Sequence, residues 1–240
     1  MNTCAKMAIG FLLFLLSTLA VVAQQRSTLT TEKVVNNLYV VKGGVANTGF
    51  LISDNEVLAI DAQMTADSAR QMLAEIKKLT SKPVTKLVLT HSDGDHVNGI
   101  GGFPQGLEII AHVQTREDMA QAFASPSRQA LQAYLPTKTF TERLDLQVGS
   151  NRIQLLYFGP AHTSGDIVVF FPAEKVVFVG DLVSLERTTP IHLQKGGSAA
   201  GLAKALKELA ELDADQFVPG HGRIASKEEI ETLAKNAAEK

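Results

Sequence analysis

The stretch LTHSDGDHVNG, residues 89–99, places two histidines and two aspartates within the six positions from His91 to His96. It includes the end of VTKLVLT (84–90), an apolar run typical of a strand buried on both faces. Imidazole nitrogens and carboxylate oxygens are ligands of zinc and of non-haem iron or manganese. If these groups were buried without partners at the end of a core strand, they would lower the stability of the folded protein. The stretch indicates either a metal site or a solvated aspartate-rich turn tightened by Gly94.

Three more residues of the same kind follow predicted strands farther along the chain. They are His162 in GPAHTSGD, Asp181 in VVFVGD and His221 in VPGHG. Each has a glycine close by, and the loops at one end of a β-sandwich converge at a common rim where sites usually form. Together the four pieces favour one shared metal site over a set of separate turns.

The periodicity of the chain predicts strands and helices in both halves. Predicted strands cover 34–42, 47–53, 56–61, 84–90, 107–112, 152–158, 166–172, 175–180 and 216–219. Predicted helices cover 66–79, 114–124, 198–212 and 226–240, the last starting at a capping box of Ser226 and Glu229. Residues 125–146 show no clear pattern. This alternation predicts two sheets packed face to face with helices outside.

The four motifs, in register with this strand pattern, resemble the metallo-β-lactamase-fold hydrolase superfamily. Its hallmark is His-x-His-x-Asp-His, then a histidine after a strand, then Gly-Asp, then Pro-Gly-His-Gly. The chain has THSDGDH (90–96), AHTSGD (161–166), GD (180–181) and PGHG (219–222) in that order. The resemblance covers nearly all of residues 34–240. It implies an α+β fold, a four-layer αββα sandwich of two mixed β-sheets flanked by helices, with a two-metal site at one edge of the sheets.

The resemblance also implies a role for each motif residue. The implied ligands are His91 and His162 for the first metal, Asp95, His96 and His221 for the second, and Asp181 as a bridge. A hydroxide between the metals would be the nucleophile, because two divalent ions lower the pKa of a shared water and polarise the substrate carbonyl. Asp95 would be both ligand and catalytic residue, orienting the water or carrying its proton. The expected cofactors are two divalent metal ions, with zinc favoured.

Asp93 departs from the family pattern, which has a histidine at that position as the third ligand of the first metal. The flavodiiron branch has a glutamate there and binds two irons. A carboxylate is a harder ligand than imidazole, so Asp93 makes iron or manganese alternatives to zinc. We expect Asp93 to bind, since the three carboxylates Asp93, Asp95 and Asp181 and one hydroxide then balance two divalent cations. In the alternative, Asp93 points away and only the second metal is held well.

Other polar residues are weaker candidates for a role in the metal site. His192 and Lys195 lie in TTPIHLQKGGS (188–198), in a segment that commonly walls the active site in this family. Contact of His192 or Lys195 with the substrate is the less favoured interpretation, and Lys195 is expected to be solvated. His112, at the end of a predicted strand, is expected at the surface or half-buried. The hydroxyl residues beside ligands are expected to form orienting hydrogen bonds: Thr90, Ser92 and Thr163.

The N-terminus reads as a secretory signal peptide. Lys6 precedes the uncharged run AIGFLLFLLSTLAVV (8–22), and Ala23 offers a small residue for cleavage. We expect a signal peptide over 1–23 and one metallo-β-lactamase-like domain over 24–240. A membrane span needs about 20 apolar residues, and the apolar run over 8–22 is shorter than that. An uncleaved membrane anchor is therefore disfavoured. Cys4 is the single cysteine, so the mature protein would depend on its core or on metal rather than on disulfides.

The composition of the chain limits the classes of partner that it is expected to bind. The chain has 23 basic and 25 acidic residues and no basic run, which argues against nucleic acid. No second long apolar run predicts a membrane span, and oligomeric state is left open. We therefore expect a periplasmic or secreted metal-dependent hydrolase, whose metal-bound hydroxide attacks an ester-, lactone- or amide-like small molecule. The alternatives are an iron-dependent redox or dioxygenase-type member, favoured only by Asp93, and a metal-holding binding protein without turnover.

The junction Val21-Val22-Ala23 predicts that the exported protein begins at Gln24. N-terminal sequencing of protein recovered outside the producing cell, or from its periplasm, checks this expectation. A membrane-retained product that still carries Met1 would contradict it.

Overall fold

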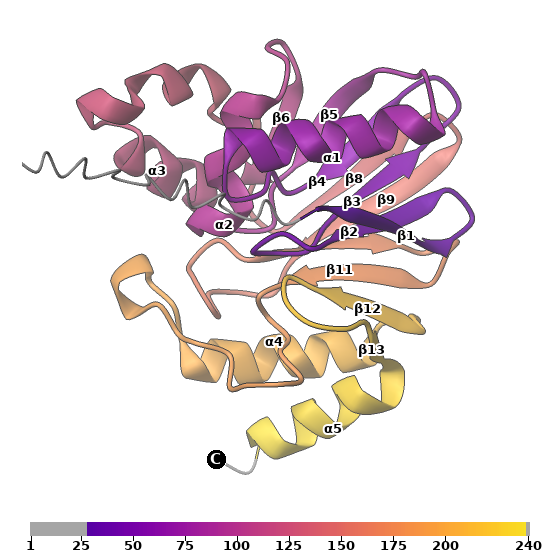
Figure 1. Ribbon diagram of the computed structural model, residues 1–240. Coiled ribbons are helices and arrows are strands. Elements are labelled where there is room, and N and C mark those ends of the chain that lie inside the picture. Colours follow the sequence, from indigo (N-terminus) through magenta and orange to yellow (C-terminus); the bar gives the residue numbers. More distant parts are fainter. Residues whose placement is uncertain (1–27, 239–240) are drawn as a thin grey trace, which may run out of the picture.

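The computed structural model describes residues 28–238, so the expected signal peptide lies outside the described residues. Two β-sheets pack face to face, with α1 over the outer surface of the first sheet and α4 and α5 over that of the second (Figure 1). The expected four-layer αββα sandwich of two mixed sheets is confirmed. Across residues 28–238, no helix has both the length and the apolar character needed to cross a membrane.

The first sheet contains seven strands in chain order. They are β1 (Thr30–Val35), β2 (Leu38–Lys42), β3 (Thr48–Ile52), β4 (Val57–Ile60), β5 (Val84–Val88), β6 (Glu108–His112) and β7 (Lys138–Phe140). Strands β1 to β4 pair antiparallel and β4 to β7 pair parallel. Parallel neighbours need crossover connections. These contain α1 (Ala66–Leu79), α2 (Gly94–Val97), the 3₁₀ turn η1 (Asn98–Gly102), α3 (Val113–Ala122) and the 3₁₀ segment η2 (Pro126–Tyr134).

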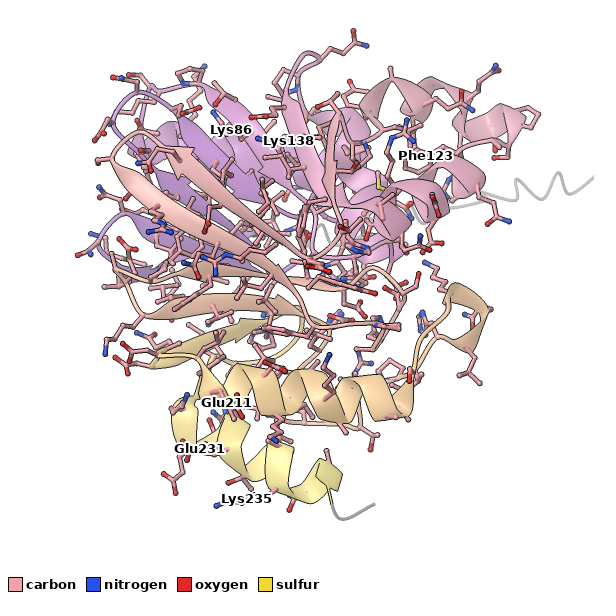
Figure 2. The ribbon with its side chains drawn as sticks, turned by 180° about the vertical axis from the view of Figure 1, so that it is seen from behind. Lys86, Phe123, Lys138, Glu211, Glu231 and Lys235 are labelled. Carbon is pink, nitrogen blue, oxygen red and sulfur yellow. The ribbon has the colours of Figure 1, made fainter. Side chains whose placement is uncertain are left out.

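The second sheet contains six strands in the order β13-β12-β11-β10-β9-β8. They are β8 (Arg143–Val148), β9 (Asn151–Tyr157), β10 (Ile167–Phe171), β11 (Val176–Gly180), β12 (Gln216–Pro219) and β13 (Ala225–Ser226). Its one parallel pair is β11 with β12. Between them run the 3₁₀ turn η3 (Leu193–Lys195) and α4 (Ala199–Glu211), and α5 (Lys227–Ala238) follows β13. Exposed side chains such as Glu231 and Lys235 lie on the outer face of α5 (Figure 2).

Alternation along the strands produces the layers, because successive side chains point to opposite faces of a sheet. In β4, Leu58 packs between the two sheets, whereas Ala59 joins the core beneath α1. In β10, Val169 lies between the sheets and Val168 joins the core beneath α4 and α5. Strands with apolar residues on both faces therefore read as continuous apolar runs in the sequence.

The structure corrects the sequence prediction in two places. The single strand predicted over 34–42 was wrong, because the chain turns at Asn36 and forms β1 and β2. Asn36 has a φ of 46°, a left-handed conformation that asparagine tolerates better than most residues. Gly94 does not tighten a turn: it is the first residue of α2, and a Cβ there would collide with the Asn98 side chain.

The C-terminal helix begins as predicted. The Glu229 backbone N–H donates to Ser226 Oγ at 3.3 Å, and the Ser226 N–H donates to Glu229 Oε2 at 2.9 Å. The capping box is therefore confirmed. Residues 125–146, which lacked a pattern, contain η2, β7 and most of β8.

The core between the sheets should dominate stability. Phe171 is fully buried there, and its ring lies 6.1 Å from that of Phe178 in an edge arrangement. Phe171→Ala should lower the free energy of unfolding by about 3–5 kcal/mol, because it removes buried apolar surface and leaves a cavity. Urea unfolding at fixed metal content measures this. Leu79→Ala, at a side chain that is 48% exposed, is the control and should change stability by less than about 0.5 kcal/mol. Equal losses for the two variants would contradict this assignment of the core.

Candidate metal centre

All seven residues predicted as metal ligands come together at one edge of the sandwich. His91, Asp93, Asp95 and His96 follow β5, His162 follows β9, Asp181 follows β11 and His221 follows β12. In Figure 1 this edge lies beside α2. Strands from both sheets end there, which explains why residues far apart in the sequence become neighbours.

Six of these side chains form two groups, within each of which one ligand-type atom from every residue lies within 4.8 Å of the others. The first group is His91, His162 and Asp181, and the second is Asp95, His96 and His221. Asp181 stands between them: its Oδ1 lies 3.3 Å from His96 Nε2, and its Oδ2 lies 3.9 Å from His162 Nε2. The division matches the one implied by the resemblance, and the roles as ligands remain predictions.

Buried polar atoms without partners mark the centre. Within residues 28–238, six buried side-chain atoms have no hydrogen-bond partner, and four of them lie here: His91 Nε2, His96 Nε2, Asp181 Oδ1 and His192 Nδ1. Buried polar groups in proteins are nearly always satisfied, so each orphan requires an explanation. Imidazole nitrogens and carboxylate oxygens facing one space are the donor set of zinc, iron and manganese. The residues present therefore fit a pair of divalent cations.

Asp61 orients the centre and was missed by the sequence analysis. Its carboxylate accepts hydrogen bonds of 2.8 Å from both the backbone N–H and the hydroxyl of Thr90, and a third of 2.8 Å from His96 Nδ1. A histidine whose Nδ1–H is held by a carboxylate presents Nε2 to a metal in a fixed direction. The available signal was a lone carboxylate ending the apolar run EVLAID (56–61).

Carboxylates and imidazoles shift one another's pKa. Burial opposes ionisation of Asp181, but the His221 and His96 imidazoles hold the pKa of its carboxyl well below the usual range. The facing carboxylates of Asp181 and Asp95 raise the pKa of His221 to about 9. Burial, together with the nearby His96, lowers the pKa of His91 well below its ordinary value. A cation entering the second group must therefore displace a proton from His221.

Asp93 faces the first group, so the alternative in which it points away is wrong. Its Oδ2 lies 3.0 Å from His162 Nε2 and 3.9 Å from His91 Nε2. Lys195 is not free in solvent as expected: its Nζ lies 2.7 Å from Asp93 Oδ1 and donates to the Ser92 carbonyl at 3.1 Å. The loop after β11 therefore closes over the first group of predicted ligands.

Thr90, Ser92 and Thr163 were expected to orient the neighbouring predicted ligands through hydrogen bonds, and this expectation is met only in part. Thr90 Oγ1 lies 3.0 Å from Nδ1 of the histidine that follows it, as predicted. The Ser92 hydroxyl donates instead to Asp118 at 2.8 Å, and that of Thr163 donates to Asp166 at 2.8 Å. Both hydroxyls thus brace the loops that carry the predicted ligands rather than the predicted ligands themselves.

His112 is more buried than expected, with 3% of its surface exposed. Its Nδ1 accepts a hydrogen bond from the Gln114 backbone at 3.3 Å and so caps α3, and its ring stacks on Tyr157 at 3.9 Å. This structural role accounts for the residue away from the metal centre.

Gly220 allows the loop that carries His221 to reach the centre. A Cβ at Gly220 would collide with Asp181 Oδ1 and crowd the His96 ring. The Gly220 carbonyl accepts a 2.7 Å hydrogen bond from the Asn47 N–H, which ties this loop to the first sheet. Close backbone packing thus joins the two sheets at the site.

The amino-acid sequence of this chain is similar to the sequences of known proteins. The chain matches the metallo-beta-lactamase superfamily over residues 41–221. The α subunit of 2,4-dinitroanisole O-demethylase from Nocardioides sp. (strain JS1661) is 29% identical over 208 residues, which are 85% of this chain and 61% of the relative. A linear primary-alkylsulfatase from Pseudomonas sp. (strain ATCC 19151) is 21% identical over 223 residues, 75% of this chain and 42% of the relative. The chain thus spans less than two thirds of either relative.

The architecture also matches solved structures. The crystal structure of the DIM-1 metallo-beta-lactamase aligns with a TM-score of 0.73 at 19% identity, covering 88% of this chain and 97% of that one. At this identity the likeness shows the fold alone. The family match extends over most of the chain and includes every strand that delivers a ligand-type residue. The chain belongs to the metallo-beta-lactamase superfamily, a superfamily of metal-dependent hydrolases.

Proposed function

We propose that this chain is an exported hydrolase that binds two divalent cations and cleaves an ester-, lactone- or amide-like small molecule. The observation that carries the proposal is the pair of ligand groups joined by Asp181, with buried atoms left unpaired. Divalent cations bound there would lower the pKa of water and polarise a substrate carbonyl. Zinc is the favoured metal, and the carboxylates also admit iron or manganese. The proposed ligands are His91, Asp93 and His162 at the first site, Asp95, His96 and His221 at the second, and Asp181 between them.

Asp95 is the residue that we propose to move the proton. Its side chain is 21% exposed, against 12% for Asp93 and 8% for Asp181, so it has the best access to incoming water. Its Oδ2 lies 3.1 Å from His221 Nε2. Burial opposes its ionisation, but His221 keeps the pKa of the Asp95 carboxyl below its usual value. It is therefore a carboxylate at neutral pH, able to orient a nucleophile and accept its proton.

Support for export comes from the sequence of residues 1–23. In an exported setting the substrate would be a small molecule that reaches the rim of the sandwich from outside the cell or from the periplasm. The names of the two relatives add an aryl methyl ether and an alkyl sulfate to the substrates that deserve assay.

Turnover should be found within a panel of esters, lactones, β-lactams, an alkyl sulfate and 2,4-dinitroanisole, assayed with zinc-, manganese- and iron-loaded protein. Asp95→Asn should lower kcat on the best substrate by about 10²–10⁴-fold, because general acid–base catalysis contributes that much. Asp67→Asn, an isosteric change at an exposed residue of α1, is the matched control and should leave kcat unchanged.

Metal content of each variant is measured alongside, so that loss of the ion is told apart from loss of proton transfer. Absence of turnover across the panel by fully loaded protein would favour the binding protein without catalysis. Metal-dependent oxygen consumption would favour the redox alternative.

His221→Ala should remove mainly the second ion and leave the first, because its imidazole belongs to the second group. In the wild type, affinity at this second site should rise from pH 7 towards pH 9, since the pKa of His221 in the metal-free protein is about 9 and protons compete less as pH increases. Metal counts after dialysis and zinc titrations at several pH values measure both effects. Loss of both ions together, or a pH-independent affinity, would contradict the division into two sites.

A further inference from the structure

The first ligand group lacks one imidazole relative to the family pattern, because position 93 holds an aspartate. A third set of ligand-type atoms within 4.8 Å of one another supplies a candidate. It joins Asp93 and His162 to His192, which lies on the loop after β11. His192 Nδ1 is 3.2 Å from Asp93 Oδ2.

The orientation of His192 indicates a ligand. The side chain is 31% exposed, so its ring reaches solvent. Its Nδ1 is nevertheless buried, and over residues 28–238 this atom has no hydrogen-bond partner. The Asp93 carboxylate lies close to this nitrogen but makes no hydrogen bond with it, and a buried polar atom left without a hydrogen bond is unfavourable. The unsatisfied Nδ1 lies 3.2 Å from Asp93 Oδ2, and the same oxygen lies 3.9 Å from the orphaned Nε2 of His91.

The backbone holds His192 in this place. Its N–H donates to the His162 carbonyl at 2.9 Å, and its own carbonyl accepts hydrogen bonds from Lys195 at 2.8 Å and Gly197 at 3.0 Å. A Cβ at Gly197 would collide with the His162 carbonyl, so glycine permits this close packing. The His162 and His192 rings lie 4.5 Å apart between centroids. His192 is thus fixed beside His162, a member of the first group.

The distances around Asp93 suit one shared ion. Its Oδ2 lies 3.0 Å from His162 Nε2, 3.2 Å from His192 Nδ1 and 3.9 Å from His91 Nε2. Ligand bonds of about 2.0–2.2 Å place the donor atoms of one ion roughly 3–4 Å apart. Lys195 pairs with the other oxygen, Oδ1, and so leaves Oδ2 for the ion. The lysine also offsets the negative charge that aspartate introduces in place of histidine.

We propose that His192 is a ligand of the first metal and restores the imidazole that the family pattern takes from position 93. The proposed first site then has three histidines and Asp93, with Asp181 shared with the second. This inference rests on the proposed two-metal function. It assigns the loop after β11 a direct part in holding the metal, in addition to any contact with substrate.

The test uses cadmium-113 as a spectroscopic probe in full-length mature protein with nitrogen-15-labelled histidine. Five imidazoles should show coupling to the metal, with His192 coupled through Nδ1 and His112 uncoupled as an internal control. The coupled set is His91, His96, His162, His192 and His221. Coupling from the other four without His192 would overturn the inference while leaving the two-metal function intact. Absence of bound metal in the wild type would overturn the proposed function itself.

A variant series gives an independent readout of affinity. His192→Ala should weaken the first site at least tenfold in a zinc titration and leave the second unchanged, whereas Leu193→Ala, at the neighbouring side chain that is 76% exposed, should bind as the wild type does. Adding Asp93→His to His192→Ala should recover part of the lost affinity by returning the imidazole to its family position. Wild-type affinity in His192→Ala would show that His192 is only an ion-pair partner of Asp93 and would overturn the inference.

Discussion

Asp181 is buried between two groups of imidazoles, and its charge determines how the residues around it must be arranged. Its two oxygens face His96, His162 and His221 at 3.3–3.9 Å, and this carboxylate follows directly from the last residue of β11. A buried charge of this kind is stable only when opposite charge and hydrogen bonds surround it. Both sheets must therefore end at the same edge, and Gly220 must approach closely enough to bring His221 into place.

The strands and the residues that gather at the centre could be predicted because their signals are local, whereas their division into two groups was implied by the family resemblance. Apolar runs gave the strands, and each ligand-type residue stands just beyond one of them, near a glycine. The turn at Asn36 was missed because the residues on either side have equal β character and only a backbone angle separates the strands. Asp61 was missed because its partners, Thr90 and His96, are about 30 residues away in the sequence.

The path of the loop after β11 could not be predicted from the sequence. The loop has little regular structure, so no periodicity predicts its path, and a solvated Lys195 was the natural expectation. The structure instead places Lys195 and His192 on the two oxygens of Asp93. An aspartate at a position where the family has histidine thus comes with a lysine that balances its charge and a histidine that offers the missing nitrogen. In the proposed two-metal centre, this pairing would make the substitution a rearrangement of the first site rather than its loss.

Anomalous diffraction at the zinc absorption edge, from crystals of the zinc-loaded protein, would locate every zinc ion bound at this edge of the sandwich. A two-metal centre should give two peaks on either side of Asp181, one bounded by His91, Asp93 and His162 and the other by Asp95, His96 and His221. A single peak, or none at this edge of the sandwich, would contradict it.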